Sequence, residues 1–245
     1  MGLVERRQRE LKQREELILL EARRLFLADG YFGLSMDKLA EAVEYSKPTI
    51  YSHFSTKEDL LLAVCNESLR QRVDLFIRAS GFNGKSRERM TAIGMADLVF
   101  VHAYRQHYEV EKLMKSTSLW DKSSDTRRED HARLDQLCMN TMGGIVGSAF
   151  AEEALDPKTS DPRAICCGLR DMSIGAHMLL GFKQRSDEEK EWVYKTLRMN
   201  QMRFLDGWGW KPLTAEWNYG ETMKRILEEV FPEEKALLPV YLTKF

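Results

Sequence analysis

The sequence contains no long hydrophobic run: no apolar stretch approaches the roughly 20 residues that a membrane-spanning helix requires. The N-terminal residues are charged rather than apolar, so we expect no secretory signal either. Together these absences predict a cytoplasmic protein with no membrane segment. Disorder is not expected, because 43% of the 245 residues are hydrophobic and can form a core.

Cysteine is scarce and shows no metal-site pattern. Cys65, Cys138, Cys166 and Cys167 have no C-x-x-C spacing and no histidine at a ligand interval, so we expect no structural zinc. The adjacent pair Cys166 and Cys167 could sense oxidants. However, neighbours on a helix point about 100° apart and rarely form a disulfide, and the alternative is that both residues pack in the interior.

Histidine and acidic residues form no strong metal or catalytic motif. His102, His107 and Asp97 are a weak metal trio, because the two histidines are five residues apart and do not share a helix face. The sequence also lacks a Ser-His-acid elbow, a phosphate-binding loop and a dinucleotide fingerprint. We therefore expect no metal, no cofactor and no catalytic site.

A large excess of positive charge is also missing. The chain has 37 basic and 38 acidic residues, a formal net charge of −1, whereas DNA-binding domains are often strongly basic. The basic residues are nevertheless concentrated locally. Residues 1–14 hold five of them against Glu5 and Glu10, and residues 45–57 hold Lys47 and Lys57 with no acid. This distribution suits a phosphate backbone, with weak non-specific binding overall.

Residues 35–59 predict two short helices joined by a tight turn. Ser35 is a helix N-cap, and an apolar face follows it at helical spacing through residues 36–43. Glu44 and Tyr45 form the turn. Ser46 is a second N-cap, with Pro48 in the first turn of a helix that begins near Lys47.

A third helix start follows at Thr56. Thr56 caps this helix, with Asp59 at its third position, and Phe54 is expected to pack into a small core with Leu39 and Leu60. In a DNA-binding pair of this kind the second helix enters the major groove, where its N-terminal side chains meet base edges. The pattern therefore predicts a helix-turn-helix DNA reader.

These motifs resemble the DNA-binding domain of the TetR family of bacterial transcriptional regulators. The resemblance spans roughly residues 14–73. It rests on Gly30-Tyr31, Ser35-Met36 and residues 40–43, and above all on SKPTIYSHFSTKEDL at residues 46–60. The resemblance implies a ligand-responsive regulator that binds a palindromic DNA operator as a homodimer. We expect it to act as a repressor. The alternatives are a helical enzyme and an effector-free architectural protein.

The resemblance and the chemistry of the side chains together nominate DNA-contacting residues. Lys47 is expected to reach guanine O6 or N7, and Pro48 and Thr49 to meet thymine methyl groups. Tyr51, His53 and Lys57 are expected at phosphates, because a cation at a helix start favours an external anion. Tyr51 could instead be a plug between helices, and His53 a helix cap. The full candidate set is Ser35, Lys47, Pro48, Thr49, Tyr51, His53 and Lys57.

The rest of the chain predicts helices only, because no β-branched alternation typical of strands is present. The first helix, residues 9–29, should bury Leu17, Leu20, Ala22, Leu25 and Phe26 and end at Gly30. The other expected helices are residues 56–78, 87–105, 108–116, 125–154, 161–183, 187–205 and 213–231, with an apolar docking tail at 237–245. The break at residues 80–84 divides a DNA-binding domain, 9–80, from a helical effector and dimerisation domain, 84–245.

The second domain offers side chains of the kind that line effector cavities in the family. We expect a small apolar or amphipathic effector, although each residue taken singly is more often plain core. The candidates are Tyr104, Trp120, Cys138, Met142, Met172 and His177. Residues 161–183 and 187–205 are expected to form the dimer, with a stripe that suits a symmetry mate or the core at Ile165, Leu169, Met172, Ala176 and Leu180.

Overall fold

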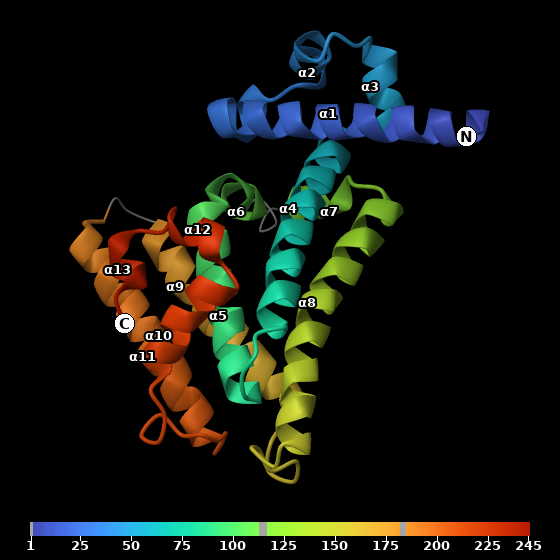
Figure 1. The fold of residues 1–245 in the computed structure, drawn as a ribbon. Coiled ribbons are helices and arrows are strands. Elements are labelled where there is room, and N and C mark those ends of the chain that lie inside the picture. The colour runs from blue at the N-terminus through green and yellow to red at the C-terminus, as the bar shows by residue number, and fades with distance from the viewer. Residues whose placement is uncertain (1, 113–116, 182–184) are drawn as a thin grey trace. The chain divides into compact units, whose positions relative to one another are not determined.

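The computed structural model describes residues 2–112, 117–181 and 185–245. All regular structure in these residues is helical, which confirms the all-α prediction (Figure 1). None of the described helices has the length and apolar content to span a bilayer. The helices are α1 Leu3–Gly33, α2 Met36–Ala42, α3 Lys47–His53, α4 Lys57–Ser80, α5 Ser86–Ala103, α6 Arg105–Glu111, α7 Thr117–Asp121, α8 Asp125–Ala151, α9 Pro162–Gly181, α10 Asp187–Gly207, α11 Tyr219–Glu229, α12 Pro232–Lys235 and α13 Val240–Thr243.

The helices form two compact units. Unit 1 consists of Met1–Gln71 and Tyr104–Asp135, and unit 2 of Arg72–Ala103 and Gln136–Phe245. Residues 104–135, which follow the sequence break at residues 80–84, thus pack with the N-terminal helices. The division of the chain into a DNA-binding domain of residues 9–80 and an effector domain of residues 84–245 stays a prediction about function.

The core of unit 1 gathers one apolar face from each of α1 to α4. Phe54, Leu39 and Leu60 are fully buried in it, as predicted. Ile50 is the buried residue of α3, and Ile18 is fully buried on α1. This small core fixes α2 and α3 on one side of α1, as Figure 1 shows.

The predicted burial of α1 was wrong at two positions. Leu17 and Leu20 are 44% and 59% exposed, whereas Ile18, Ala22 and Leu25 are buried. Steps of four and three residues join these three side chains into one stripe, and Leu17 and Leu20 lie outside it. The predicted end of the helix at Gly30 is confirmed in substance, because Gly30 has φ +69° and interrupts α1 before its last turn.

The predicted bounds of two helices were wrong: residues 108–116 for α6 and residues 213–231 for α11. α6 begins at Arg105 instead of residue 108 and ends at Glu111, and the predicted residues 113–116 lie outside the described residues. α11 begins at Tyr219 instead of residue 213. The Asn218 side chain accepts a hydrogen bond from the Glu221 N–H at 3.1 Å and caps this helix.

Unit 2 includes the C-terminal tail, which docks as predicted. Leu238 and Leu242 are buried, and α13 packs on α10 while α11 and α12 pack on α5. Arg87, which is fully buried, joins these parts of the chain. Its guanidinium pairs with Asp206 at 2.7 Å and donates to the Thr214 hydroxyl at 3.1 Å. The chain after residue 212 is therefore an integral part of unit 2.

Candidate nucleic-acid interface

Side-chain caps mark the N-termini of α2, α3 and α4. The Ser35 hydroxyl accepts a hydrogen bond from the Lys38 N–H at 3.2 Å, and the Ser46 hydroxyl accepts one from the Thr49 N–H at 3.3 Å. Thr56 does the same for the Asp59 N–H at 2.9 Å. All three predicted caps are confirmed. Each one satisfies a backbone donor that the first turn of a helix leaves without a partner.

The turn between α2 and α3 is a left-handed helix end at Glu44. The Tyr45 N–H donates to the Ala40 carbonyl at 3.0 Å, and the Glu44 N–H donates to the Glu41 carbonyl at 3.2 Å. This pair of hydrogen bonds is a Schellman motif, and Glu44 occupies its left-handed position with φ +56°. The motif sets the direction in which the chain enters α3.

α3 exposes most of its side chains to solvent, and Thr49 and His53 are half-buried. Ile50 is fully buried, whereas Lys47, Pro48 and Tyr51 are exposed, and the Tyr51 side chain is 50% accessible. A ring with that exposure does not fill the space between helices, so the plug alternative for Tyr51 is not supported. The Thr49 hydroxyl lies 2.8 Å from that of Ser46. Because the Thr49 hydroxyl is engaged with Ser46, the methyl group is the part of the Thr49 side chain that can make apolar contacts.

Lys47 has a partner that the sequence did not reveal. Its Nζ donates to Asp37 Oδ2 at 2.6 Å, which joins the front of α3 to the first turn of α2. This hydrogen bond to Asp37 raises the pKa of Lys47. Both side chains are more than half exposed, so water screens the pair and its contribution to stability is small. The Lys47 ammonium is thus engaged with Asp37, and its contact with a base stays a prediction.

Lys57 also has partners within unit 1. Its Nζ donates to the Tyr31 carbonyl oxygen and lies 4.0 Å from the centroid of the Tyr31 ring. Burial lowers the pKa of Lys57. The tyrosine in turn donates its hydroxyl proton to Glu58 Oε1 at 2.7 Å. These contacts weaken the argument that a cation at this helix start requires an external anion. An ammonium has three donors, and its contact with phosphate stays a prediction.

The model of the family described as bacterial regulatory proteins of the tetR family matches residues 18–64. This segment contains α2, α3 and the cap of α4 whose geometry is given above. The N-terminal domain belongs to the TetR family.

Curated relatives match part of the chain. The HTH-type transcriptional activator FasR of Mycolicibacterium smegmatis is 31% identical over 98 residues, which are 40% of this chain and 45% of FasR. The HTH-type transcriptional repressor AcnR of Corynebacterium diphtheriae is 39% identical over 66 residues, 27% of this chain and 35% of AcnR. The chain thus spans less than half the length of these relatives.

Solved TetR-type structures extend the likeness along the chain. A regulator of the TetR/AcrR family from Thermobifida fusca superposes with a TM-score of 0.62 at 20% identity, over 80% of this chain and 98% of that one. AibR, solved in complex with isovaleryl coenzyme A and operator DNA, superposes with a TM-score of 0.54 at 20% identity, over 76% and 97% of the two chains. At these identities the likeness shows the fold.

The six effector candidates do not lie in one unit. Tyr104 and Trp120 belong to unit 1, whereas Cys138, Met142, Met172 and His177 belong to unit 2. In unit 1 the Trp120 ring lies 5.1 Å from that of His131, at 83°. In unit 2 Cys138, Met142 and His177 are buried and Met172 is half-buried. Their role as an effector wall stays a prediction.

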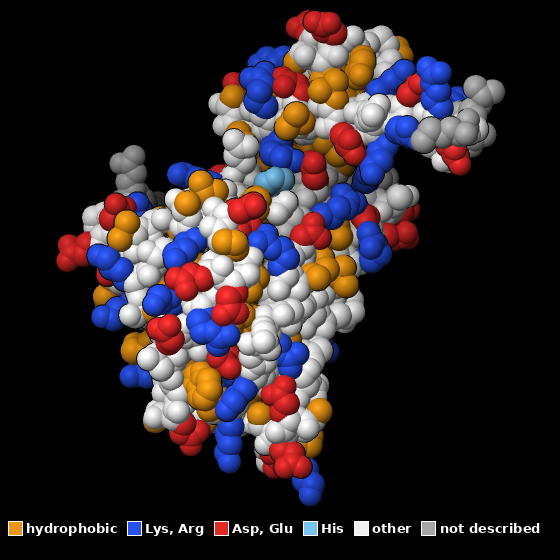
Figure 2. Space-filling view, in the orientation of Figure 1, with side chains coloured by type: hydrophobic (Ala, Val, Ile, Leu, Met, Phe, Trp, Pro, Cys, Tyr) orange, Lys and Arg blue, Asp and Glu red, His pale blue; other side chains and the backbone are white. Residues whose placement is uncertain are grey.

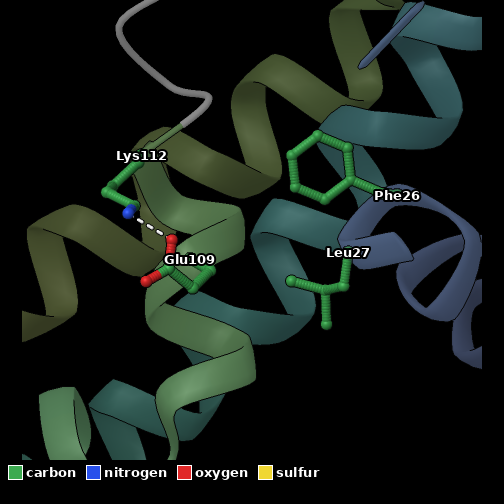
Figure 3. A pocket seen from close by; sticks show the side chains of 4 residues that line it. All are labelled: Phe26, Leu27, Glu109 and Lys112. Carbon is green, nitrogen blue, oxygen red and sulfur yellow. Dashed lines mark ion pairs between the residues drawn. The ribbon is translucent and has the colours of Figure 1, made fainter. Parts of the chain in front are cut away.

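A hollow that sequence reasoning missed lies in unit 1 beside α1 and α6. It has a volume of about 330 Å³ and is open to solvent, and its described lining residues are Phe26, Leu27, Glu109 and Lys112 (Figure 3). An ion pair between Glu109 and Lys112 forms its polar side. The two apolar residues are successive positions of α1 just before its interruption at Gly30, and no motif in the sequence marked them.

Unit 2 contains a buried polar cluster around Asp97. Arg72 donates to one oxygen of Asp97, and His177 Nδ1 lies 3.5 Å from the other. Burial lowers the pKa of His177. Next to it, His102 Nε2 lies 2.9 Å from the hydroxyl of Tyr194, whose ring centroid is 5.8 Å from that of His177. The cluster places polar groups in the interior of unit 2.

The metal and redox interpretations of the sequence gain no support. The described residues contain no group of three histidine, cysteine or acidic side chains placed to hold a metal. His107 belongs to unit 1, whereas His102 and Asp97 belong to unit 2. All four cysteines are free thiols, and burial raises the pKa of Cys166 to about 11. Few Cys166 thiolates exist at neutral pH, which favours the packing alternative.

His107 contacts an arginine and a serine within unit 1. Arg23 Nη1 lies 3.3 Å from His107 Nε2, and His107 Nδ1 lies 3.1 Å from the Ser68 hydroxyl. Because arginine only donates, Nε2 must accept and the imidazole must be neutral. Burial, followed by the charge of Arg23, lowers the pKa of His107 to about 4.

We expect acid to destabilise unit 1 through His107. The unfolded chain takes up a proton near pH 6.5, whereas the folded chain does so only near pH 4, so stability falls as pH drops between these values. After allowance for partial exposure the loss is about 1–2 kcal/mol. Urea unfolding at a series of pH values, with His107→Gln as the matched variant, measures it. An identical pH dependence in both proteins would contradict the assignment.

Proposed function

We propose that this TetR-type chain is a transcriptional regulator that binds a palindromic DNA operator as a homodimer and responds to a small apolar or amphipathic effector. The observation that carries the proposal is the surface of α3. Its N-terminal residues Lys47 and Pro48 are exposed and Thr49 is half-buried, while Ile50 and the following Phe54 anchor the helix in the core of unit 1. Such a short capped helix, with its front accessible to solvent, suits insertion into a major groove.

Lys47 and Asp37 together suit selective reading of a base. At a guanine, Lys47 exchanges a charge-assisted hydrogen bond to Asp37 for similar bonds to O6 and N7. At another base Lys47 forms weaker hydrogen bonds than at guanine, so its ion pair with Asp37 competes with base binding.

Substitution of Lys47 is expected to affect base preference, and substitution of Lys57 or Tyr51 is expected to affect phosphate binding. Lys47→Ala should relax the preference at one base pair in each half-site by about 1–3 kcal/mol. Lys57→Ala should weaken binding to all sequences and lower the salt slope by about one unit, and Tyr51→Phe should also weaken binding uniformly. Fluorescence titrations at several salt concentrations, with operator and base-substituted duplexes, separate the two effects.

The outcome for each residue is independent of the others. Unchanged discrimination at every position in Lys47→Ala would remove Lys47 from the base readers. A changed base preference with an unchanged salt slope in Lys57→Ala would refute its phosphate role. Because Lys57 also binds the Tyr31 carbonyl, Lys57→Arg is the matched control that keeps the charge.

The proposed dimer uses α9 and α10 of unit 2. Of the predicted stripe on α9, Ile165 and Leu169 are buried within the unit and therefore pack against its own core. Other large apolar side chains of the two helices remain exposed and support pairing with a second copy: Ile174, Leu179, Trp192 and Met199. A dimer provides two recognition helices related by two-fold symmetry, which is why a palindromic operator is expected.

The proposed effector is amphipathic, and the proposed sign of regulation is repression. AibR, solved in complex with isovaleryl coenzyme A and operator DNA, supports an amphipathic effector with an acyl chain and polar groups. We favour repression, in which the effector binds preferentially to the conformer whose recognition helices are wrongly spaced for DNA. Since one curated relative is an activator and another a repressor, a reporter gene placed behind the operator tests the sign.

A further inference from the structure

α1 continues far beyond the region that matches the family. The helix begins at Leu3, whereas the family match begins at residue 18. Side chains 5–14 of this N-terminal extension are all exposed. In Figure 1 the extension runs past α3, and Figure 2 shows Lys and Arg side chains gathered along it. The extension lies within unit 1, the same unit as the candidate DNA interface.

One face of the extension continues the buried stripe of α1. Arg7, Leu11 and Arg14 precede Ile18 and Leu25 at steps of four, three, four and seven residues, which keep all five on one side of a helix. Ile18 and Leu25 are buried in the core that carries α2 and α3. Arg7 and Arg14 therefore lie on the side of α1 that supports the helix-turn-helix.

The two arginines on this face differ from other basic residues of the extension. Arg6 pairs with Glu10 at 3.0 Å and Lys12 pairs with Glu16 at 3.8 Å, so intrahelical acids offset these charges. Within residues 2–112, 117–181 and 185–245, no acidic side chain pairs with Arg7 or Arg14. The extension thus carries positive charge selectively on the face adjacent to α3.

We propose that Arg7 and Arg14 form a second DNA contact, on the phosphate backbone that flanks each half-site. The inference rests on the proposed function and adds a partner surface to it. Two arguments favour duplex DNA as the occupant: the face is continuous with the candidate interface, and its charge is complementary to phosphate. Two turns of helix separate the arginines by about 10 Å, a length over which duplex DNA presents several phosphates.

The test compares two double variants of the full-length chain. Arg7→Ala/Arg14→Ala removes the two arginines that have no acidic partner, whereas Arg6→Ala/Lys12→Ala removes the same charge from the paired positions. On a duplex extended by about one turn beyond each half-site, the first variant should lower the salt slope by about two units per protomer, and the second by less than one. Circular dichroism checks that both variants keep the helix.

A second duplex, trimmed to the footprint of the recognition helices, locates the contact. On it the Arg7→Ala/Arg14→Ala variant should bind like the unmodified chain. Equal salt slopes for the two variants on the extended duplex, or an equal loss on both duplexes, would overturn the inference while the proposed function stands. If the unmodified chain bound neither duplex, the proposed function would fail and the inference with it.

Discussion

Replacing Phe54 with alanine is expected to destabilise unit 1 by about 3–5 kcal/mol and to abolish selective DNA binding. Phe54 is fully buried between α3 and α4, in one cluster with Leu39 and Leu60. Its N–H also closes α3 by donating to the Ile50 carbonyl at 3.0 Å. Alanine keeps that hydrogen bond but leaves a cavity where α3 is anchored, so the recognition helix loses its support.

Hydrogen exchange of amides in α2 to α4 measures this loss as a free energy of opening. Phe54→Leu keeps most of the apolar volume and should cost less than about 1.5 kcal/mol. Tyr51→Ala is the matched control on the exposed side of the same helix, and we expect a change within about 0.5 kcal/mol. An effect of Phe54→Ala no larger than that of Tyr51→Ala would contradict the packing described here.

Replacing Asp97 with alanine is expected to destabilise unit 2 by about 3 kcal/mol. The carboxylate is nearly buried, with 9% of its side chain exposed, and it pairs with both Arg72 and His177. Arg72 is held in place by the Phe100 ring, whose centroid lies 4.2 Å from the guanidinium carbon. Without Asp97 this guanidinium stays in the interior as an unbalanced charge.

The control for Asp97 is an exposed acid in the same unit. Asp171 on α9 pairs with Arg170 at 3.4 Å and is 67% exposed, so Asp171→Ala should cost less than about 1 kcal/mol. Thermal unfolding, monitored by hydrogen exchange of amides in α5 and α9, compares the Asp97→Ala and Asp171→Ala variants. Similar losses in both variants would show that the Asp97 cluster is not a buried ion pair. Asp97→Asn, which removes charge but keeps hydrogen bonding, should lie between them.

Local signals in the sequence predicted the helix-turn-helix well. The caps at Ser35, Ser46 and Thr56 each involve residues three positions apart, so their geometry depends on the local sequence alone. The periodicity of α1 predicted a buried face but placed it one residue off at Leu17 instead of Ile18. Because Leu17 and Ile18 are adjacent and both apolar, only the packing of α1 against its neighbours determines which of them is buried.

Contacts between distant residues could not be predicted in the same way. The partners of Lys47 and Lys57, which are Asp37 and Tyr31, lie 10 and 26 residues away and are fixed only once α1 to α4 have packed. The same holds for residues 104–135, which join unit 1 although the strongest break in the sequence precedes them. The positive charge of Lys57 at the start of α4 predicted an external anion, whereas in the structure its ammonium donates to the Tyr31 carbonyl oxygen.

Sequencing of the DNA fragments that the protein retains from its own genome tests most directly whether α3 reads DNA in two symmetric half-sites. We expect a palindromic motif whose half-sites lie about one helical turn, or a multiple of it, apart. We also expect the Lys47→Ala protein to retain fragments with reduced preference at one position in each half. Retained fragments without a shared motif, or a motif identical for both proteins, would contradict this role of α3.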